Sequence, residues 1–180
     1  MSIHSQHPFF PAEEHRSALR RLRGRLVAPV TLWTAGKDHA RAGLTVTSAL
    51  LADGEPGRLL GIVDAEAELW AAIERTGRLV MAPLSPSDQH LADVFGGVAP
   101  APGGPFRLAD WRETAWGPVL RDATSWCGCR LLSAREVGYG LLVDAAVERI
   151  EVGNEPVPLA YHRGRYRSLD LGRGQAAPPE

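Results

Sequence analysis

Three hydroxyl side chains lie close together in an otherwise apolar segment, Gly-Leu-Thr-Val-Thr-Ser at residues 43–48, where they are Thr45, Thr47 and Ser48. Hydroxyls beside main-chain N–H groups form a neutral surface that can donate hydrogen bonds to an anion or to a ring carbonyl. A half-buried strand with its threonines facing outward explains the same pattern. The residue types and their spacing leave both interpretations open.

Two cysteines and six histidines are the other residues that could carry chemistry. Side chains alternate along a strand, so Cys127 and Cys129 are expected on one face, where free cysteine is usually a small buried hydrophobe. A disulfide between them would strain a strand. The histidines are scattered, with no pair four residues apart on a helix, so no metal site is predicted; they are His4, His7, His15, His39, His90 and His162.

Motifs for nucleotide binding and nucleophilic catalysis are absent from the sequence. No Gly-x-Gly-x-x-Gly follows a strand, and no Gly-x-x-x-x-Gly-Lys-Ser/Thr occurs. A Rossmann dinucleotide site and a P-loop are therefore not supported. No nucleophile elbow supports a Ser/His/Asp triad, and no catalytic residue is identified.

Length and composition indicate one globular domain over residues 1–180. The chain is 44% hydrophobic and 23% charged, with a formal net charge of −1. A chain of this length buries enough surface to form a full core without disulfides or a metal. Lys37 is the only lysine among 20 basic residues. Arginine suits phosphate or carboxylate recognition, but replacement of surface lysines explains the bias as well.

The same numbers bear on partners and location. A net charge near zero argues against a general nucleic-acid binder. No apolar run is long enough for a signal peptide or a membrane span. Two cysteines do not make the disulfide framework of a small secreted protein, so we expect a cytoplasmic protein. We expect residues 1–11 and 170–180 to be flexible termini.

The first half of the chain predicts alternating strands and helices. We expect an amphipathic helix over residues 11–23. Turns rich in glycine and aspartate separate three strands, at residues 26–34, 42–51 and 59–63. Asp64 is expected to cap a helix that runs to Arg75 and ends at Gly77. A buried strand follows at residues 79–84.

The second half predicts one more helix and then long strands. Ser85 and Pro86 should start a helix whose apolar face is ended by two glycines. A loop at residues 98–105 follows, folded back by Phe106 and Trp111. Long antiparallel strands are expected at residues 119–132 and 141–152 around a turn at 134–140, and then a closing hairpin around Gly164. Six or more strands with two helices predict a mainly β protein, a closed antiparallel barrel with helices packed on it.

Several segments, in order along the chain, resemble one family. These are Val-Thr-Leu-Trp-Thr at 30–34 with Ala-Gly-Leu-Thr-Val-Thr-Ser at 42–48, the helix and strand at 69–84 with Asp-Gln-His-Leu-Ala-Asp-Val-Phe at 88–95, Gly-Pro-Val-Leu at 117–120 with Cys-Arg-Leu at 129–131, and Leu-Ala-Tyr-His-Arg-Gly-Arg-Tyr at 159–166. Over residues 18–169 the chain resembles the flavin reductase-like family, whose fold is an FMN-binding split β-barrel.

The resemblance implies a homodimer with flavin sites near the interface. It also implies that the flavin groove is lined, through hydroxyls and main-chain N–H groups, by Leu44, Thr45, Val46, Thr47 and Ser48. Ala82 stands where many relatives have asparagine, and it is the sixth predicted flavin-site residue. Tyr139 stands where reductases of the family often have histidine, so a stacking role is one hypothesis for it and a plain strand-end aromatic is the other.

The implied activity is hydride transfer from NADH or NADPH to FMN, with FAD as the other candidate flavin and a monooxygenase as a candidate recipient of reduced flavin. The cofactor carries the electronic work in such a reaction, which fits the absence of a triad. One alternative is a module that binds flavin or haem without turnover. Another is a protein whose arginines bind a nucleic acid or an acidic protein.

Overall fold

The computed structural model describes residues 18–154 and 157–169. The predicted flexible termini, residues 1–11 and 170–180, lie outside the described residues. Of the helix predicted over residues 11–23, the described part is α1, Ala18–Arg23, which buries none of its side chains. In the described ranges, no helix is long and apolar enough to cross a lipid bilayer.

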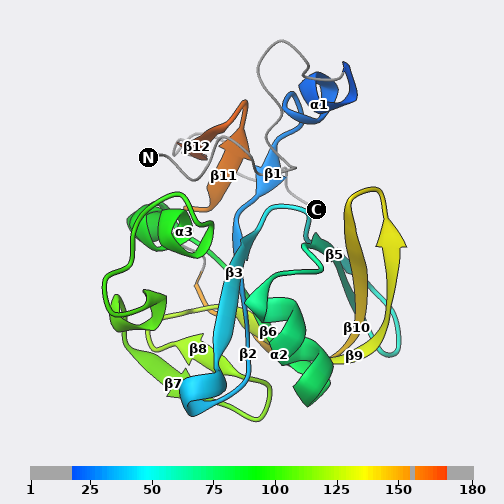
Figure 1. The fold of residues 1–180 in the computed structure, drawn as a ribbon, viewed down its shortest axis with the longest axis vertical. Coiled ribbons are helices and arrows are strands. Elements are labelled where there is room, and N and C mark those ends of the chain that lie inside the picture. Colours follow the sequence, from blue (N-terminus) through cyan, green and yellow to red (C-terminus); the bar gives the residue numbers. More distant parts are fainter. Residues whose placement is uncertain (1–17, 155–156, 170–180) are drawn as a thin grey trace, which may run out of the picture.

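A seven-stranded antiparallel sheet forms the body of the molecule (Figure 1). Its strands lie in the order β3-β2-β6-β9-β10-β5-β4, so β3 and β4, which follow one another in sequence, form opposite edges. The strands are β2 (Thr31–Ala35), β3 (Ala42–Val46), β4 (Leu50–Ala52), β5 (Arg58–Val63), β6 (Arg78–Pro83), β9 (Trp126–Val137) and β10 (Gly140–Glu151). The expected mainly β architecture of split-barrel type is confirmed.

The inward face of this sheet encloses the main core. Trp33 of β2 is fully buried there, together with Leu59 of β5 and Cys129 of β9. Burying large apolar side chains of this kind is the main favourable contribution to the stability of the fold. The indole of Trp33 lies directly over Gly61 of β5, where an added Cβ would be 2.6 Å from its Cη2 atom. The sheet is therefore curled far enough to bring β2 and β5 face to face.

Helix α2 (Glu68–Thr76) packs on this core through Leu69, Ala72 and Ile73. Its end is as predicted, because Gly77 adopts a left-handed φ of 66° and its N–H donates to the carbonyl of Ile73. Its start is not. The cap position is Ala67, and the Asp64 carboxylate accepts a 2.9 Å hydrogen bond from the N–H of Glu66 instead. Asp64 closes a turn before the helix, a local alternative that aspartate often adopts.

Helix α3 (Gln89–Phe95) covers the outer face of β2 and β3. A 3₁₀ turn, Pro86–Asp88, leads into it from Ser85, where the sequence predicts the helix start. Ser85 and Asp88 form a reciprocal capping box, which was not predicted. Phe95 packs with ring centroids 5.1 Å from Phe106 and 5.9 Å from Trp111. The prediction that Phe106 and Trp111 fold the loop back onto the body is confirmed.

Three long strands predicted from the sequence are each divided in the structure. Residues 26–34 become β1 (Ala28–Pro29) and β2, which belong to different sheets, because β1 pairs with β11. Residues 42–51 become β3 and β4. Residues 119–132 become β8 (Pro118–Leu120) and the start of β9. Each break lies where the chain passes from one sheet, or one sheet edge, to another.

Two small sheets complete the fold. β11 (Leu159–His162) and β12 (Arg165–Ser168) form the predicted closing hairpin, and β7 (Trp111–Glu113) pairs with β8. The β9–β10 ladder runs further than predicted, so the turn at 134–140 shrinks to Gly138 and Tyr139. Tyr139 is 88% exposed at the tip of this hairpin.

Candidate functional site

The predicted flavin-site segment begins in β3, an edge strand, and continues past its end at Val46 into Thr47 and Ser48. Among the described residues β3 pairs with β2 alone. The main-chain groups along its outer edge are therefore outside any ladder, and an edge of this kind can pair with a ligand or another chain. Ala42 and Val46 point into the main core and Leu44 packs against it, so Leu44 and Val46 offer a ligand only their main-chain groups.

The hydroxyl of Thr45 is already used within the fold. It donates a 2.8 Å hydrogen bond to the carbonyl oxygen of Ala92 in α3. Gly43, on the same outer face, lies beneath Phe95, and a Cβ there would be 2.6 Å from its Cε1 atom. This side of β3 is thus occupied by α3, and Thr45 serves to hold that helix against the sheet.

The hydroxyl of Ser48 is also used, to close the barrel. It accepts a hydrogen bond from the main-chain N–H of Ile62 at 2.8 Å and donates one to the carbonyl of the same residue at 3.0 Å. Ile62 lies in β5, next to the opposite edge strand. Ser48 therefore acts as a main-chain partner for β5 where the two edges of the curled sheet meet.

Thr47 is the remaining hydroxyl of the predicted segment. It is half-buried, and its hydroxyl makes no hydrogen bond with any residue that the structure describes. Of the three hydroxyls, this one keeps both its donor and its acceptor capacity for a ligand. The hydroxyl-rich sequence identifies all three side chains. Only the structure shows that Thr45 is bonded to Ala92 and Ser48 to Ile62, which leaves Thr47 as the hydroxyl available to a ligand.

Ala82 lies on the same face of the sheet as Thr45, two strands away. Leu32 of β2 pairs with Thr45 on one side and with Ala82 on the other, so the three residues form one cross-strand row. Ala82 is only 3% exposed and packs with Val80, Val119 and Trp126. Of the predicted residues, the structure thus places Ala82 on the face of Thr45 alone, separated from it by Leu32 and covered by its own cluster.

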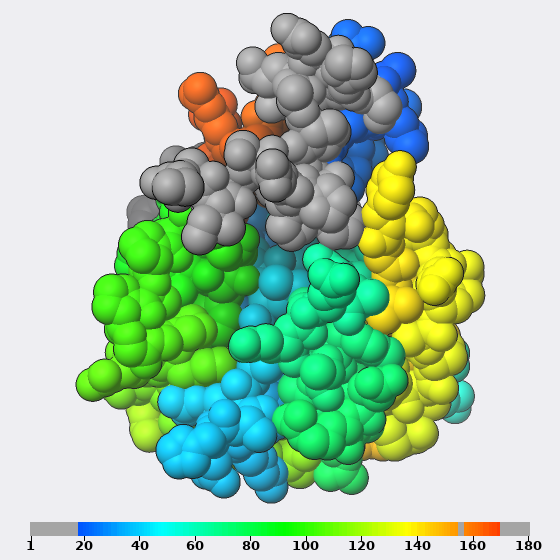
Figure 2. Space-filling view, in the orientation of Figure 1, coloured from blue at the N-terminus to red at the C-terminus, as the bar shows by residue number. Residues whose placement is uncertain are grey.

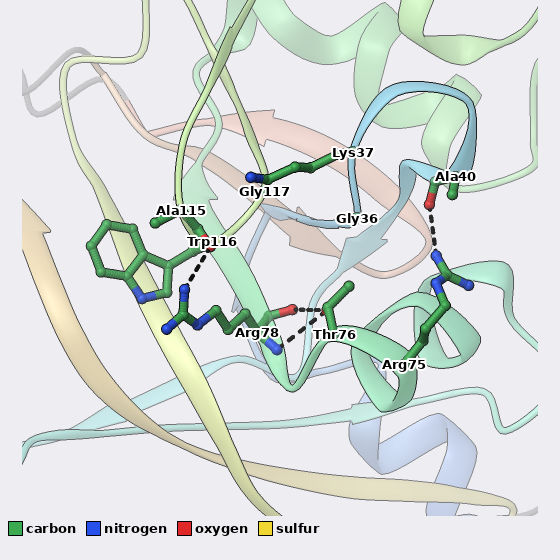
Figure 3. A pocket seen from close by; sticks show the side chains of 9 residues that line it. All are labelled: Gly36, Lys37, Ala40, Arg75, Thr76, Arg78, Ala115, Trp116 and Gly117. Carbon is green, nitrogen blue, oxygen red and sulfur yellow. Dashed lines mark hydrogen bonds between the residues drawn. The ribbon is translucent and has the colours of Figure 1, made fainter.

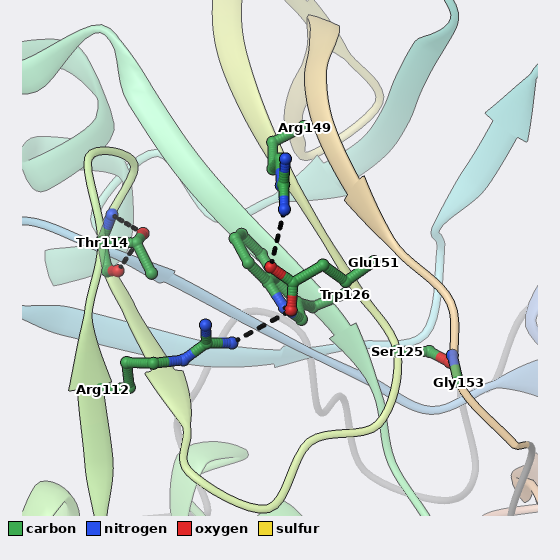
Figure 4. A network of polar contacts seen from close by, with 8 residues as sticks. Arg112, Thr114, Ser125, Trp126, Arg149, Glu151 and Gly153 are labelled. Carbon is green, nitrogen blue, oxygen red and sulfur yellow. Dashed lines mark hydrogen bonds and ion pairs between the residues drawn. The ribbon is translucent and has the colours of Figure 1, made fainter.

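Trp126, which packs with Ala82, is held by a polar network around Glu151. Figure 4 shows this network. The Glu151 carboxylate accepts a 2.8 Å hydrogen bond from the indole N–H of Trp126, and it pairs with Arg112 at 3.3 Å and Arg149 at 3.2 Å. These contacts, the indole bond first, lower the pKa of Glu151. They tie β7, through Arg112, to the β9–β10 hairpin. No pattern in the sequence indicates this network, since its members come from three strands.

The edge of β3 fits the polar atoms of a flavin. The ring of FMN carries carbonyl oxygens and an imide N–H, which need neutral donors and acceptors at short range. The outer edge of β3 supplies main-chain N–H and C=O groups, and Thr47 supplies a hydroxyl. No ionisable side chain lies within residues 42–49. This segment therefore places no charged side chain beside a neutral flavin ring.

The cysteines lie away from this edge, inside the barrel. Cys127 and Cys129 are both buried on one face of β9, as predicted, with their sulfur atoms 3.6 Å apart. The hydrogen bond between them and burial both raise the pKa of Cys129. Within the described ranges, no group of three or more His, Cys, Asp or Glu side chains is arranged to hold a metal ion.

The chain is similar to known proteins over most of its length. The family model for the flavin reductase like domain matches residues 23–170. An FMN reductase (NADH) RutF from Methylorubrum populi is 31% identical over 166 residues, which cover 91% of this chain and 82% of the relative. A second, from Variovorax paradoxus, is 30% identical and covers 96% of this chain and 90% of the relative.

Solved structures agree with these matches. Component B of nitrilotriacetate monooxygenase from Mycobacterium thermoresistibile superposes with a TM-score of 0.78 at 25% identity, covering 90% of each chain. The styrene monooxygenase flavin reductase from Pseudomonas putida S12 has the same fold, with a TM-score of 0.75 at 20% identity over 87% of this chain and 99% of that one. The protein described here therefore belongs to the flavin reductase like domain family.

Proposed function

We propose that this protein is an FMN reductase that binds FMN at the β3 edge and transfers a hydride to it from NADH. The observation that carries the proposal is the 31% identity with an FMN reductase (NADH) across 91% of the chain. Because that similarity spans the whole barrel, it includes the β3 segment and the elements that position it. NADPH and FAD remain the alternative donor and flavin to be compared in the assay.

FMN supplies the electron-accepting ring, and the protein supplies binding, orientation and the exclusion of water. The main-chain N–H groups on the outer edge of β3 are suited to donate to ring carbonyls, and the Thr47 hydroxyl to a further polar atom of the flavin. Because Ser48 and Thr45 fix the two ends of this segment to β5 and α3, the donors are held at fixed spacing. Such fixed spacing keeps two stacked rings in a reactive orientation.

Hydride transfer between two rings needs no nucleophile and no general base from the protein. The β3 segment contains no ionisable side chain, which agrees with this requirement. The proposal therefore assigns residues 44–48 to cofactor binding and none of them to acid–base chemistry. Ala82 packs with Val80, Val119 and Trp126, so its role in this proposal is to shape the sheet face beside the site and not to form a hydrogen bond with the flavin.

Three further parts of the proposal concern assembly and context. We propose a homodimer of single-domain chains, each domain spanning residues 1–180, because exposed apolar side chains such as Leu50 at 61% and Ile150 at 62% lie on strands at the surface. The recipient of reduced flavin is proposed to be a monooxygenase, as the names of the styrene and nitrilotriacetate relatives suggest. The location proposed is the cytoplasm.

A steady-state assay tests the proposal. Purified protein is mixed with NADH or NADPH and with FMN or FAD, and oxidation of the nicotinamide is followed by its absorbance. We expect oxidation that requires both substrates, is fastest with FMN and NADH, and falls strongly in Thr47→Val. If neither nicotinamide is consumed with either flavin, the reductase proposal is wrong. Flavin or haem retained through purification without turnover would instead identify the non-catalytic module.

A further inference from the structure

One end of the molecule carries a concentration of arginine side chains. It consists of α1, β1 and the β11–β12 hairpin, which lie together beyond the seven-stranded sheet (Figure 1). Figure 2 shows α1 in blue and the hairpin in orange at the surface of this end. Residues 18–30 and 157–169, which build it, contain seven arginines and no acidic residue, although the whole chain has a formal net charge of −1. The positive charge of the chain is therefore distributed unevenly.

Six exposed arginines of these two segments form what we call the arginine-rich end: Arg21, Arg23, Arg25, Arg163, Arg165 and Arg167. None of the six forms an ion pair or a side-chain hydrogen bond with a described residue. The main-chain N–H of Arg163 donates to the carbonyl of Gly24 at 3.0 Å, so the turn of the hairpin lies beside the end of α1. Two segments far apart in the sequence are thereby joined in one positive surface.

The arginine-rich end adjoins the candidate flavin edge, the outer edge of β3 with Thr47. The last pair of the β2–β3 ladder contains Val46, so Val30 and Thr47 come next on the two chains. The N–H of Val30 donates to the carbonyl of Leu159 at 3.1 Å, and Leu159 begins β11. Arg163 is four residues further along this hairpin, so its Cα lies at most about 14 Å from that of Leu159. The arginines are therefore neighbours of the flavin edge and not part of it.

Acidic side chains also lie near this junction. Asp64 and Glu66 follow β5, two and four residues after Ile62, the partner of the predicted flavin-site segment. Asp93 of α3 lies near Tyr166 of β12, because burial and then the charge of Asp93 raise the pKa of Tyr166 to about 12. These carboxylates belong to the barrel and its helices, whereas residues 18–30 and 157–169 contain none. An anion that approaches the flavin edge from the side of α1 and β12 therefore meets arginine side chains first.

A recess at the opposite end of β3 provides an internal comparison (Figure 3). It has a volume of about 470 Å³, and Lys37, Arg75 and Arg78 are among the residues that line it. Arg75 donates to the carbonyl of Ala40 at 2.9 Å and Arg78 to the carbonyl of Ala115 at 3.2 Å, so the two guanidinium groups point to opposite sides. These cations are not directed at one anion, and they lie far from the flavin edge. They are suited to serve as control positions.

We propose that the arginine-rich end attracts the phosphate group of FMN and so accelerates the encounter of FMN with the β3 edge. The inference rests on the proposed function, since it takes that edge as the flavin site. A phosphate monoester carries a charge of about −1.5 to −2 at neutral pH, whereas riboflavin has the same ring without a phosphate. Attraction needs no contact, because the field of an exposed charge extends about 10 Å at 0.1 M salt and about 30 Å at 0.01 M. The arginine-rich end thus distinguishes FMN from riboflavin through the association rate.

Stopped-flow fluorescence of the full-length protein tests this without turnover. FMN or riboflavin is mixed with the protein, and the quenching of flavin fluorescence gives the association rate constant. The salt concentration is raised from about 10 mM to about 300 mM, which shortens the Debye length from about 30 Å to below about 10 Å. We expect the rate constant of FMN to fall at least about fivefold over this range, and that of riboflavin to stay the same.

Two double variants remove charges from the arginine-rich end. Arg165→Gln/Arg167→Gln, on β12, should lower the association rate constant of FMN at low salt at least about threefold and leave that of riboflavin unchanged. Arg21→Gln/Arg23→Gln, on α1, should act in the same direction. Because α1 buries none of its side chains, the second variant keeps the test decisive if the first does not fold.

Lys37→Gln/Arg75→Gln is the matched control, since it makes the same change in net charge at the recess and should leave FMN association close to that of the wild type. The inference is wrong if FMN and riboflavin respond alike to salt, if neither arginine variant slows FMN association, or if the control slows it equally. Salt-dependent FMN association without NADH oxidation would contradict the reductase proposal alone. NADH oxidation with salt-independent FMN association would contradict this inference alone, and binding of neither flavin would contradict both.

Discussion

Ser48 holds Ile62 by both of its main-chain groups, with hydrogen bonds of 2.8 Å from the amide N–H and 3.0 Å to the carbonyl. Where the two edges of the sheet meet, the Ser48 side chain thus supplies the hydrogen bonds that a neighbouring strand would otherwise make with Ile62. A segment first identified by its capacity to bind a ligand is therefore also the segment that closes the barrel.

Replacing Ser48 with alanine should loosen this junction. The variant loses two partly exposed hydrogen bonds, so we expect a loss of about 1 kcal/mol in the free energy of unfolding. The amide of Ile62 should exchange with solvent faster, as measured by hydrogen exchange. Ser133→Ala, at an exposed serine of β9 whose hydroxyl makes no hydrogen bond with the described residues, is the control and should change neither quantity. Unchanged exchange at Ile62 in Ser48→Ala would contradict the assigned role.

Thr45 and Thr47 should separate stability from flavin binding. Thr45→Val removes the hydrogen bond to the Ala92 carbonyl, which keeps only its bond from the N–H of Gly96, so it should cost about 1 kcal/mol in the free energy of unfolding. Thr47→Val removes a hydroxyl that makes no hydrogen bond with the described residues, so it should leave the unfolding midpoint unchanged and weaken FMN affinity. Urea denaturation and fluorescence titration of FMN measure the two effects. Equal FMN affinity in Thr47→Val and the wild type would show that the flavin does not contact this hydroxyl.

Gly43 should not tolerate a side chain. In Gly43→Ala the new Cβ would lie 2.6 Å from Cε1 of Phe95. Phe95 is buried against Phe106 and Trp111, so it cannot move away freely. We expect a loss of about 1–3 kcal/mol, typical of overpacking, and a displacement of α3. Gly57→Ala, where the nearest atom would be 3.5 Å away, is the control. Chemical denaturation of both variants distinguishes the outcomes, and equal stability would contradict the close approach.

The Asp144–Arg58 pair predicts how stability depends on pH. Arg58 donates to both carboxylate oxygens, at 2.9 and 2.7 Å, and this lowers the pKa of Asp144. A pKa lowered by folding stabilises the native state above the unfolded-state pKa of about 3.9, and the stabilisation is lost as pH falls through the folded-state value. Asp144→Asn should therefore be less stable at neutral pH and lose less stability on acidification.

Denaturant midpoints at neutral pH and near pH 3 measure this difference. Asp53→Asn, at an exposed aspartate without an ion pair in the described ranges, is the matched control and should follow the wild type at both pH values. If Asp144→Asn and the wild type show parallel pH profiles of stability, the ion pair makes no measurable contribution to the free energy of unfolding. Many exposed ion pairs behave in this way.

Local signals predicted some elements well and non-local contacts decided the rest. The start of the helix after Ser85 depends on neighbouring residues, Ser85 and Pro86, so the sequence predicts it. The division of residues 42–51 into two strands depends on which sheet edge each half joins, and no local pattern contains that information. Asp64 failed as a predicted cap because its carboxylate had a second local partner, the N–H of Glu66.

The same distinction applies to the sites. Sequence identified the hydroxyl-rich segment, but the bond between Thr45 and Ala92 joins residues 47 positions apart and could not be anticipated. The arginine bias in the sequence is consistent with replacement of surface lysines and does not say where any arginine lies. Only the folded chain shows that Arg75 and Arg78 line one recess with the single lysine, Lys37.

The junction between Ser48 and Ile62 also has a consequence for the order of folding. These residues are only 14 positions apart, whereas Thr34 of β2 must find Val80 of β6 to build the centre of the sheet. The entropy lost on closing a chain segment rises with its length, by about 0.6 kcal/mol for each doubling. The contact between Ser48 and Ile62 therefore closes a shorter chain segment, at a lower entropic cost, than the pairing of the central strands.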